Sequence, residues 1–118
     1  MKLRHAALIA LIGIAGVAVS TAIAQEPPRL LFEITIDGSV VARPELRVAS
    51  GGKGTIAFDD NDVTFVPTIR PDDITLAFEI VDKEKRLTPT LVISRTVPGS
   101  IEWASARQTV QLTVSWVP

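Results

Sequence analysis

Two glutamates occupy matching places in this sequence and could in principle form an acid–base pair. Glu33 lies in the tripeptide Phe-Glu-Ile, and Glu79 lies in a second copy of the same tripeptide. Glycosidases use two carboxyl groups in this way, one as the acid and one as the base or nucleophile. Each glutamate, however, falls on the polar side of an alternating apolar pattern, which would point it to solvent. We therefore interpret both as solubilising residues and predict a chain without catalytic residues, which is not an enzyme.

Clustered acidic and amide side chains form the second group that could do chemistry, as ligands of a calcium ion. Calcium prefers carboxylate and carbonyl oxygens. The candidate ligands are Asp59, Asp60 and Asp62, with Asn61 between them and with Asp72 and Asp73 further along the chain. Their spacing differs from that of an EF-hand loop, and Asp and Asn are common in ordinary turns. We therefore expect a turn rather than a metal site, and no cofactor.

The scarcity of certain residue types excludes the commonest catalytic and metal chemistries. The sequence has a single histidine, His5, and it has neither cysteine nor tyrosine. Because His5 lies in a predicted leader, the mature chain would lack the groups for Ser-His-Asp or Cys-His catalysis. It would also lack the imidazole and thiolate ligands of zinc sites. Residues 50–54 resemble a phosphate-binding loop only in composition, since no helix is predicted to follow them.

The N-terminus has the three parts of a secretory signal peptide. Lys2 and Arg4 form a basic opening, Ala6–Val19 is an uncharged apolar run, and Ala22-Ile23-Ala24 is a small-residue cleavage site. These features predict a signal peptide over residues 1–24 and one mature domain over residues 25–118. The alternative is an uncleaved anchor, because the apolar run is nearly long enough to span a bilayer. After cleavage we expect no stable membrane insertion.

Charge and cysteine content narrow the compartment and the class of partner. Outside the predicted leader the sequence has ten of its 12 Lys and Arg residues, against 13 acidic residues. The basic residues are scattered, which argues against nucleic acid as a partner. Small eukaryotic secreted domains usually carry disulfides. A secreted chain without cysteine is therefore expected to be bacterial, and either periplasmic or released from the cell.

Alternating apolar and polar residues predict strands throughout the mature chain, and no helical period is present. The alternations cover residues 30–37, 40–49, 56–58 and 63–70, and then residues 74–81, 89–93, 101–103 and 109–116. Turn residues separate them, among which Asp37-Gly38 is a strong hairpin signal. About eight short, mostly antiparallel strands of this kind predict an all-β fold, a sandwich of two sheets.

The two halves of the mature chain, residues 29–70 and 74–117, resemble each other. Phe32-Glu33-Ile34 recurs as Phe78-Glu79-Ile80, 46 residues later. A spacing of 45 residues relates Pro44, Leu46, Val48, Gly54, Ile56 and Phe58 to Pro89, Leu91, Ile93, Gly99, Ile101 and Trp103. The same spacing places Val63 or Phe65 near Gln108 and Val110. We interpret this as the duplication of a four-stranded unit, against the alternative that any two amphipathic strand pairs look alike.

Each unit has one apolar face that must be buried. We expect each unit to form one sheet, and the two sheets to pack face to face. Trp103 matches the apolar position of Phe58, and Trp116 continues an apolar alternation. Both tryptophans are therefore predicted to lie in the core. The prolines Pro44, Pro67 and Pro89 are expected at edge strands or bulges.

Residues 40–80 also resemble part of a known protein family. The segments VVARPELRVASGGKGTIAF and VTFVPTIRPDDITLAFEI look like the core β-domain of bacterial secretins, the outer-membrane pores of secretion and pilus systems. That domain has a Pro-containing strand, a turn and a short apolar strand, then a strand ending near Pro. The chain lacks the ring-building domains and the length of a secretin. The resemblance therefore implies a small periplasmic relative or accessory protein, and it carries over no functional residue.

These observations together favour a non-catalytic binding or assembly protein of the cell envelope or of a secretion system. Its partner would be another envelope or secreted protein. Val40-Val41 or Val92 could supply an apolar strand edge for that partner. The alternative is a secreted enzyme inhibitor that presents an ordered loop, for which Val81–Thr88 is the best candidate.

Overall fold

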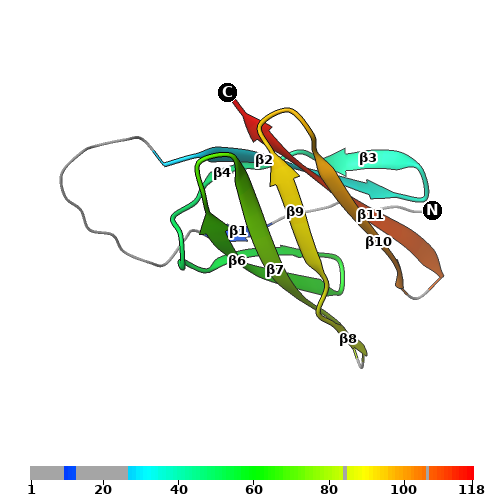
Figure 1. Cartoon of the computed structure of the whole chain (residues 1–118). Coiled ribbons are helices and arrows are strands. Elements are labelled where there is room, and N and C mark those ends of the chain that lie inside the picture. Colours follow the sequence, from blue (N-terminus) through cyan, green and yellow to red (C-terminus); the bar gives the residue numbers. More distant parts are fainter. Residues whose placement is uncertain (1–9, 13–26, 84, 106) are drawn as a thin grey trace.

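The computed structural model describes residues 10–12, 27–83, 85–105 and 107–118 (Figure 1). Strands and turns make up all of these segments, and no helix occurs in them. None of them therefore contains a helix that could cross a membrane. The predicted signal peptide lies outside the described residues except for Ala10–Ile12.

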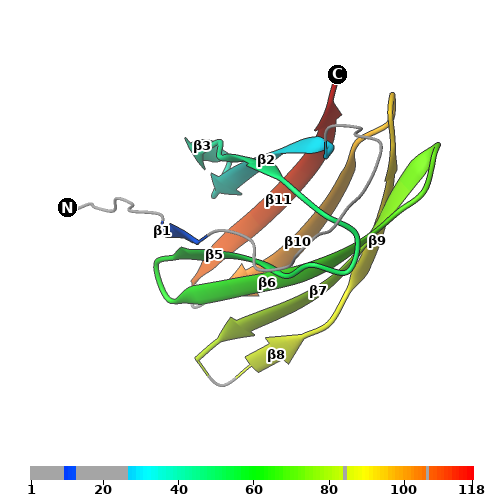
Figure 2. The ribbon, with the colours of Figure 1, turned by 90° about the vertical axis from the view of Figure 1, so that its left-hand side faces the viewer.

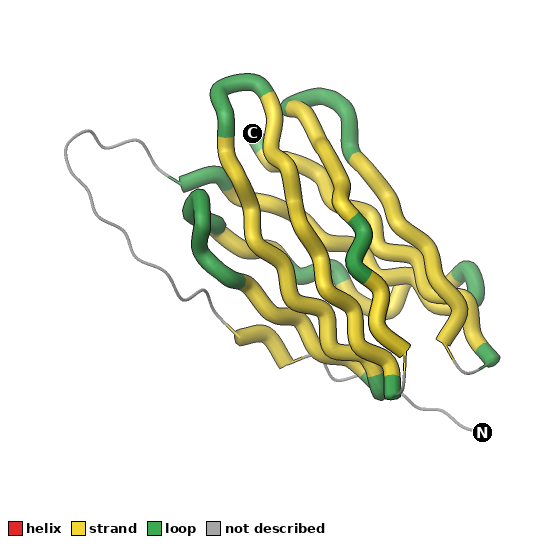
Figure 3. The backbone as a smooth tube through the Cα atoms, turned by 60° about the horizontal axis from the view of Figure 1, so that its bottom comes forward, coloured by secondary structure: helices red, strands yellow, loops and turns green. Residues whose placement is uncertain are grey.

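The strands follow one another in the chain with short connections. They are β1 (Ala10–Ile12), β2 (Arg29–Ile36), β3 (Ser39–Ala42), β4 (Glu45–Arg47), β5 (Gly54–Phe58), β6 (Asn61–Ile69), β7 (Asp73–Asp82), β8 (Lys85–Leu87), β9 (Thr90–Ser94), β10 (Gly99–Ser105) and β11 (Gln108–Val117). All pairings between them are antiparallel. Turns and loops lie mainly at the ends of the strands (Figure 3).

The strands form two sheets that face each other, which confirms the predicted β-sandwich (Figure 2). One sheet has the order β1-β5-β6-β7-β8, with β9 also paired to β7. The other has the order β10-β11-β2-β3, with β4 also paired to β2. Apart from β1, the two orders become the same when each strand is exchanged for its counterpart in the other half. The counterparts are β5 and β10, β6 and β11, β7 and β2, β8 and β3, and β9 and β4.

The division of strands between the sheets differs from the expectation that each half forms its own sheet. The last hairpin of the first half, β5–β6, pairs with β7 of the second half. In the same way β10–β11 pairs with β2. The reason is the short turn between β6 and β7, at residues 70–72, which makes these long strands adjacent in one sheet. Each sheet therefore contains strands from both halves.

The described residues form three strands more than the eight predicted segments: β1, and one additional strand beside each of two prolines. Pro44 separates β3 from β4, and Pro89 separates β8 from β9. A proline has no backbone N–H for the ladder and is tolerated at a sheet edge. The carbonyl oxygens of both prolines still accept bonds from the neighbouring strand, at 2.8 Å from Phe32 N and 2.9 Å from Phe78 N. The predicted strand over residues 40–49 is thus two short edge strands, whereas in the second half β8 precedes the predicted strand over residues 89–93.

The first hairpin turn has the geometry that its sequence predicts. Asp37 has φ of 50° and Gly38 has φ of 87°, so both central residues are left-handed, as a two-residue type I′ turn requires. Asp37 also bonds to the beginning of β11, because its Oδ1 accepts a hydrogen bond of 2.9 Å from Thr109 N. The Asp-Gly turn therefore fixes the register of β2 with β3 and contacts a third strand.

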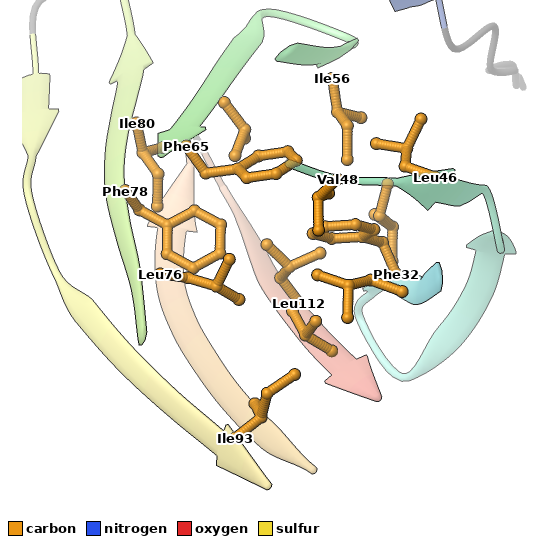
Figure 4. Close-up of a cluster of buried hydrophobic side chains, with 14 of the residues drawn as sticks. Phe32, Leu46, Val48, Ile56, Phe65, Leu76, Phe78, Ile80, Ile93 and Leu112 are labelled. Carbon is orange, nitrogen blue, oxygen red and sulfur yellow. The ribbon is translucent and has the colours of Figure 1, made fainter. Parts of the chain in front are cut away.

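The core lies between the two sheets. All of its buried apolar side chains fall between Leu30 and Val114. Phe32 of one sheet and Phe65 of the other meet at its centre, with ring centroids 5.0 Å apart (Figure 4). Phe78, which neighbours Phe65 on the next strand, extends this contact with a centroid distance of 5.9 Å.

The two tryptophans have different environments. Trp103 is 6% exposed and packs against Phe58 with the rings tilted by 48° and their centroids 6.5 Å apart, which confirms its predicted place in the core. Trp116 is only half-buried and packs at the margin of the core. The guanidinium of Arg95 lies 4.2 Å from the centroid of its ring. The indole therefore has one face on the apolar core and one face under a cation.

The pairing registers also correct one part of the predicted correspondence between the halves. Gly54 lies opposite Phe65, and Gly99 lies opposite Val114. Phe65 therefore matches Val114, and not Val110 as the constant spacing of 45 residues indicated. The reason is the length of the second hairpin, since β10 has 7 residues where β5 has 5.

Candidate functional site

The two glutamates of the Phe-Glu-Ile repeats lie on the outer faces of different sheets. Glu33 belongs to β2 and Glu79 to β7, and the residues on either side of each point into the core. Each forms an ion pair with an arginine, at 3.3 Å from Arg43 Nε to Glu33 and 3.1 Å from Arg86 Nε to Glu79. Because the core separates them, the two carboxylates cannot act together on one glycosidic bond.

The acidic turn between β5 and β6 does not gather its oxygens around one point. Asp59 has a left-handed φ of 50°, and a carboxylate oxygen of Asp60 lies 3.7 Å from Lys83 Nζ. Asp62 is exposed on β6. Asp72 and Asp73 lie beyond the other end of β6, with Arg70 paired to Asp73 at 3.0 Å. Among the residues that the structure describes, no three His, Cys, Asp or Glu side chains are placed to hold a metal ion.

Asn61 of the same turn points inward and links the two sheets. Its side chain is buried, with 2% of its surface exposed. Its Oδ1 accepts a bond of 3.1 Å from Trp103 Nε1, and its Nδ2 donates to Ser105 Oγ at 3.4 Å. Buried polar groups of this kind need partners, and here they satisfy one another. Sequence analysis assigned Asn61 to a turn and missed this network. The sequence around Asn61 gives no signal for it, because Trp103 lies 42 residues away.

The exposed large apolar side chains are valines, and three of them lie on edge strands. Val40 is 52% exposed and Val41 is 42% exposed on β3, while Val92 is 58% exposed on β9. The order of the sheets gives β3 a single neighbour, β2. The structure thus places the predicted edge residues at edges, with their side chains accessible to a partner.

The segment proposed as an inhibitory loop, Val81–Thr88, is a hairpin rather than an open loop. Val81 pairs with Arg86, and Asp82 pairs with Lys85. Lys85 Nζ donates a bond of 3.0 Å to the carbonyl oxygen of Ala104 on β10 of the other sheet. This hairpin is therefore ordered by contacts on both sheets, and it lies at one end of the molecule (Figure 1).

The edge of the first sheet beside β5 carries a feature that sequence analysis did not predict. Residues Ala10–Ile12 form β1 and pair with β5, with Leu11 opposite Ile56 (Figure 2). These residues lie in the apolar run of the predicted leader. All three residues are apolar and show no alternation, so the sequence pattern could not distinguish a strand from part of a signal peptide here.

The chain matches no family model, no curated protein and no solved structure in the comparisons with known proteins. The predicted resemblance to the secretin core domain thus stays a prediction.

Proposed function

We propose that this chain is an exported, non-catalytic binding protein of the bacterial cell envelope, which recognises another envelope or secreted protein. Its place would be the periplasm, or the medium after release, once residues 1–24 are removed. The observation that carries the proposal is the pair of exposed valines on edge strand β3, Val40 and Val41. An edge strand offers unpaired backbone groups to a partner strand, and apolar side chains on that edge add affinity and specificity.

The distribution of polar groups supports a binding role rather than a catalytic one. Glu33, Glu79 and Asp60 are each paired with a cationic side chain on the surface, and the core separates the two glutamates. An active site would instead bring such groups together in a concave, partly buried pocket. A resemblance to secretin core domains favours a partner in a secretion or pilus system.

The test is co-purification after cross-linking in periplasm. The full gene is expressed with its leader, and the exported chain is compared with a Val40→Lys, Val41→Lys variant. A matched control adds the same charge elsewhere, through Thr68→Lys and Thr96→Lys, at two positions that are also exposed. We expect one cross-linked protein to be lost in the β3 variant and kept in the control. Equal recovery in both variants, or retention of the chain in the cytoplasm, would contradict the proposal.

A secreted enzyme inhibitor is the second candidate function. The specific observation in its favour is the tethered hairpin at Val81–Thr88, because substrate-like inhibitors present a rigid segment to the enzyme. The anchoring bond from Lys85 to Ala104 would provide that rigidity. A cross-linked partner that is a hydrolase, and that is lost on Arg86→Ala but not on the β3 substitutions, would favour this candidate over the first.

We also propose that the scaffold arose by duplication of one unit, residues 29–70 and 74–117. Three features of the structure support this proposal. Leu30 lies opposite Leu46 where Leu76 lies opposite Leu91. The backbone bonds to Pro44 and Pro89 are equivalent. The strand order of one sheet is that of the other with the halves exchanged. A chance likeness between amphipathic strands would account for alternation but not for equivalent pairings across both sheets.

A further inference from the structure

We propose that the β5 edge of the exported chain is a strand-acceptor site, which binds an extended, uncharged apolar segment of a partner protein. In the precursor this site is occupied by the chain's own leader. The inference rests on the proposed function, because it requires export and removal of residues 1–24. It names a second edge, distinct from β3, and the chemistry of the segment that fits there.

The structure itself shows what kind of segment pairs with β5. The Ala-Leu-Ile sequence of β1 lies antiparallel to it, with Ala10 opposite Ala57 and Ile12 opposite Thr55. In the sheet order β1 is terminal and has β5 as its single neighbour. Its departure would uncover the backbone groups of β5 on that side.

The corresponding edge of the second sheet, at β10, is protected where β5 is not. Glu102 is exposed at the position that matches Ala57. Charged side chains on an edge strand oppose pairing with another strand. Lys85 also occupies the carbonyl oxygen of Ala104 on β10, at 3.0 Å. No residue of β5 is charged, and on the side away from β6 it pairs, among the described residues, with the leader segment β1.

The first test traps the pairing in the precursor. Because the chain has no cysteine, the double variant Ala10→Cys, Ala57→Cys has one possible disulfide, between directly opposite positions of an antiparallel pair. The full-length chain, purified from cytoplasm, is oxidised and its intramolecular disulfide is measured by mass spectrometry. The staggered control is Ile12→Cys, Ala57→Cys. We expect the first pair to close at least ten times faster, whereas equal rates would overturn the occupancy of β5 by the leader.

The second test asks whether the exported chain accepts a strand in trans. The probe is a synthetic peptide of residues 7–15, and its binding to the exported chain is measured by fluorescence anisotropy. We expect saturable binding that Ala57→Glu weakens at least tenfold. Ala57→Glu copies the residue of the matching edge, so it is expected to fold. Ala104→Glu on β10 adds the same charge as a control and should leave binding unchanged.

Each other outcome of these experiments overturns the proposal. Absence of peptide binding, or binding that Ala57→Glu does not change, would show that β5 accepts no strand. A leader that stays attached after export would leave the edge occupied. If the exported Ala57→Cys variant forms disulfide-linked dimers that exclude the peptide, the occupant is a second copy of the chain. None of these results bears on the β3 cross-linking test, so the two proposals fail separately.

Discussion

The buried bond between Asn61 and Trp103 gives the sharpest stability prediction, because it joins the two sheets through side chains that water hardly reaches. We consider the substitution Asn61→Leu, which keeps the size of the side chain and removes its amide. Trp103 Nε1 then loses the acceptor that lies 3.1 Å away. With 6% of Trp103 exposed, water has little access to replace it. An unsatisfied buried donor costs about 1–3 kcal/mol of unfolding free energy.

The bond from Asn61 to Ser105 adds little to this figure, because its length of 3.4 Å is near the limit for a hydrogen bond. We therefore expect Asn61→Leu to lower the unfolding free energy by about 2 kcal/mol. For a domain of this size that corresponds to a fall in melting temperature of about 8–16 °C. Ser105→Ala should cost less than about 1 kcal/mol.

A double-mutant cycle isolates the contact. Trp103→Phe removes the donor, so Asn61→Leu should cost less in that background, with a coupling energy of about 1–2 kcal/mol. The measurement is urea-induced unfolding of the chain, followed by far-ultraviolet circular dichroism so that the loss of the indole does not affect the signal. Additive effects of the two substitutions would refute the view that this bond joins the sheets.

The remaining predictions concern one close packing contact and the acidic turn. Gly54→Ala should lower the unfolding free energy by about 1–3 kcal/mol through overpacking, because the new methyl meets the ring of Phe65; Phe65→Leu in the same chain should recover part of this loss in urea unfolding. Gly51→Ala, at a φ of 83° with no atom within 4 Å, should cost about 1–2 kcal/mol through its backbone alone, and Phe65→Leu should not relieve it. Adding calcium, or removing it with a chelator, should leave the melting temperature unchanged in scanning calorimetry; a rise that disappears in Asp59→Asn would contradict our interpretation of the turn.

The alternation of apolar residues was sufficient to predict the layers of this fold. Each alternating segment buries one face. In β7, for example, Leu76, Phe78 and Ile80 each have at most 3% of their surface exposed. The period of two fixes which residues point inward, whatever the neighbouring strand is. The Asp-Gly turn was predictable for a similar local reason, because its left-handed backbone favours these two residues.

The pairing between strands could not be predicted in the same way, because it depends on contacts distant in sequence. The outer residues of β2 are compatible with several neighbours, and only the assembled sheet places β11 beside it. The inward turn of Asn61 has the same cause. Asn is a common turn residue, and its role depends on Trp103, which lies 42 residues away in the chain.

Differences between the two halves are more informative about function than their similarities. If the halves are copies, positions that support the fold need the same residue type in both, as at Phe32 and Phe78 or at Pro44 and Pro89. The edges are under no such constraint. Glu102 and Ala57 hold matching positions on β10 and β5, and within the described part of the chain an added strand pairs with β5 but not with β10. A fold that protects one of two equivalent edges has the means to protect both. The uncharged edge of β5 is therefore best explained by a strand that it must accept.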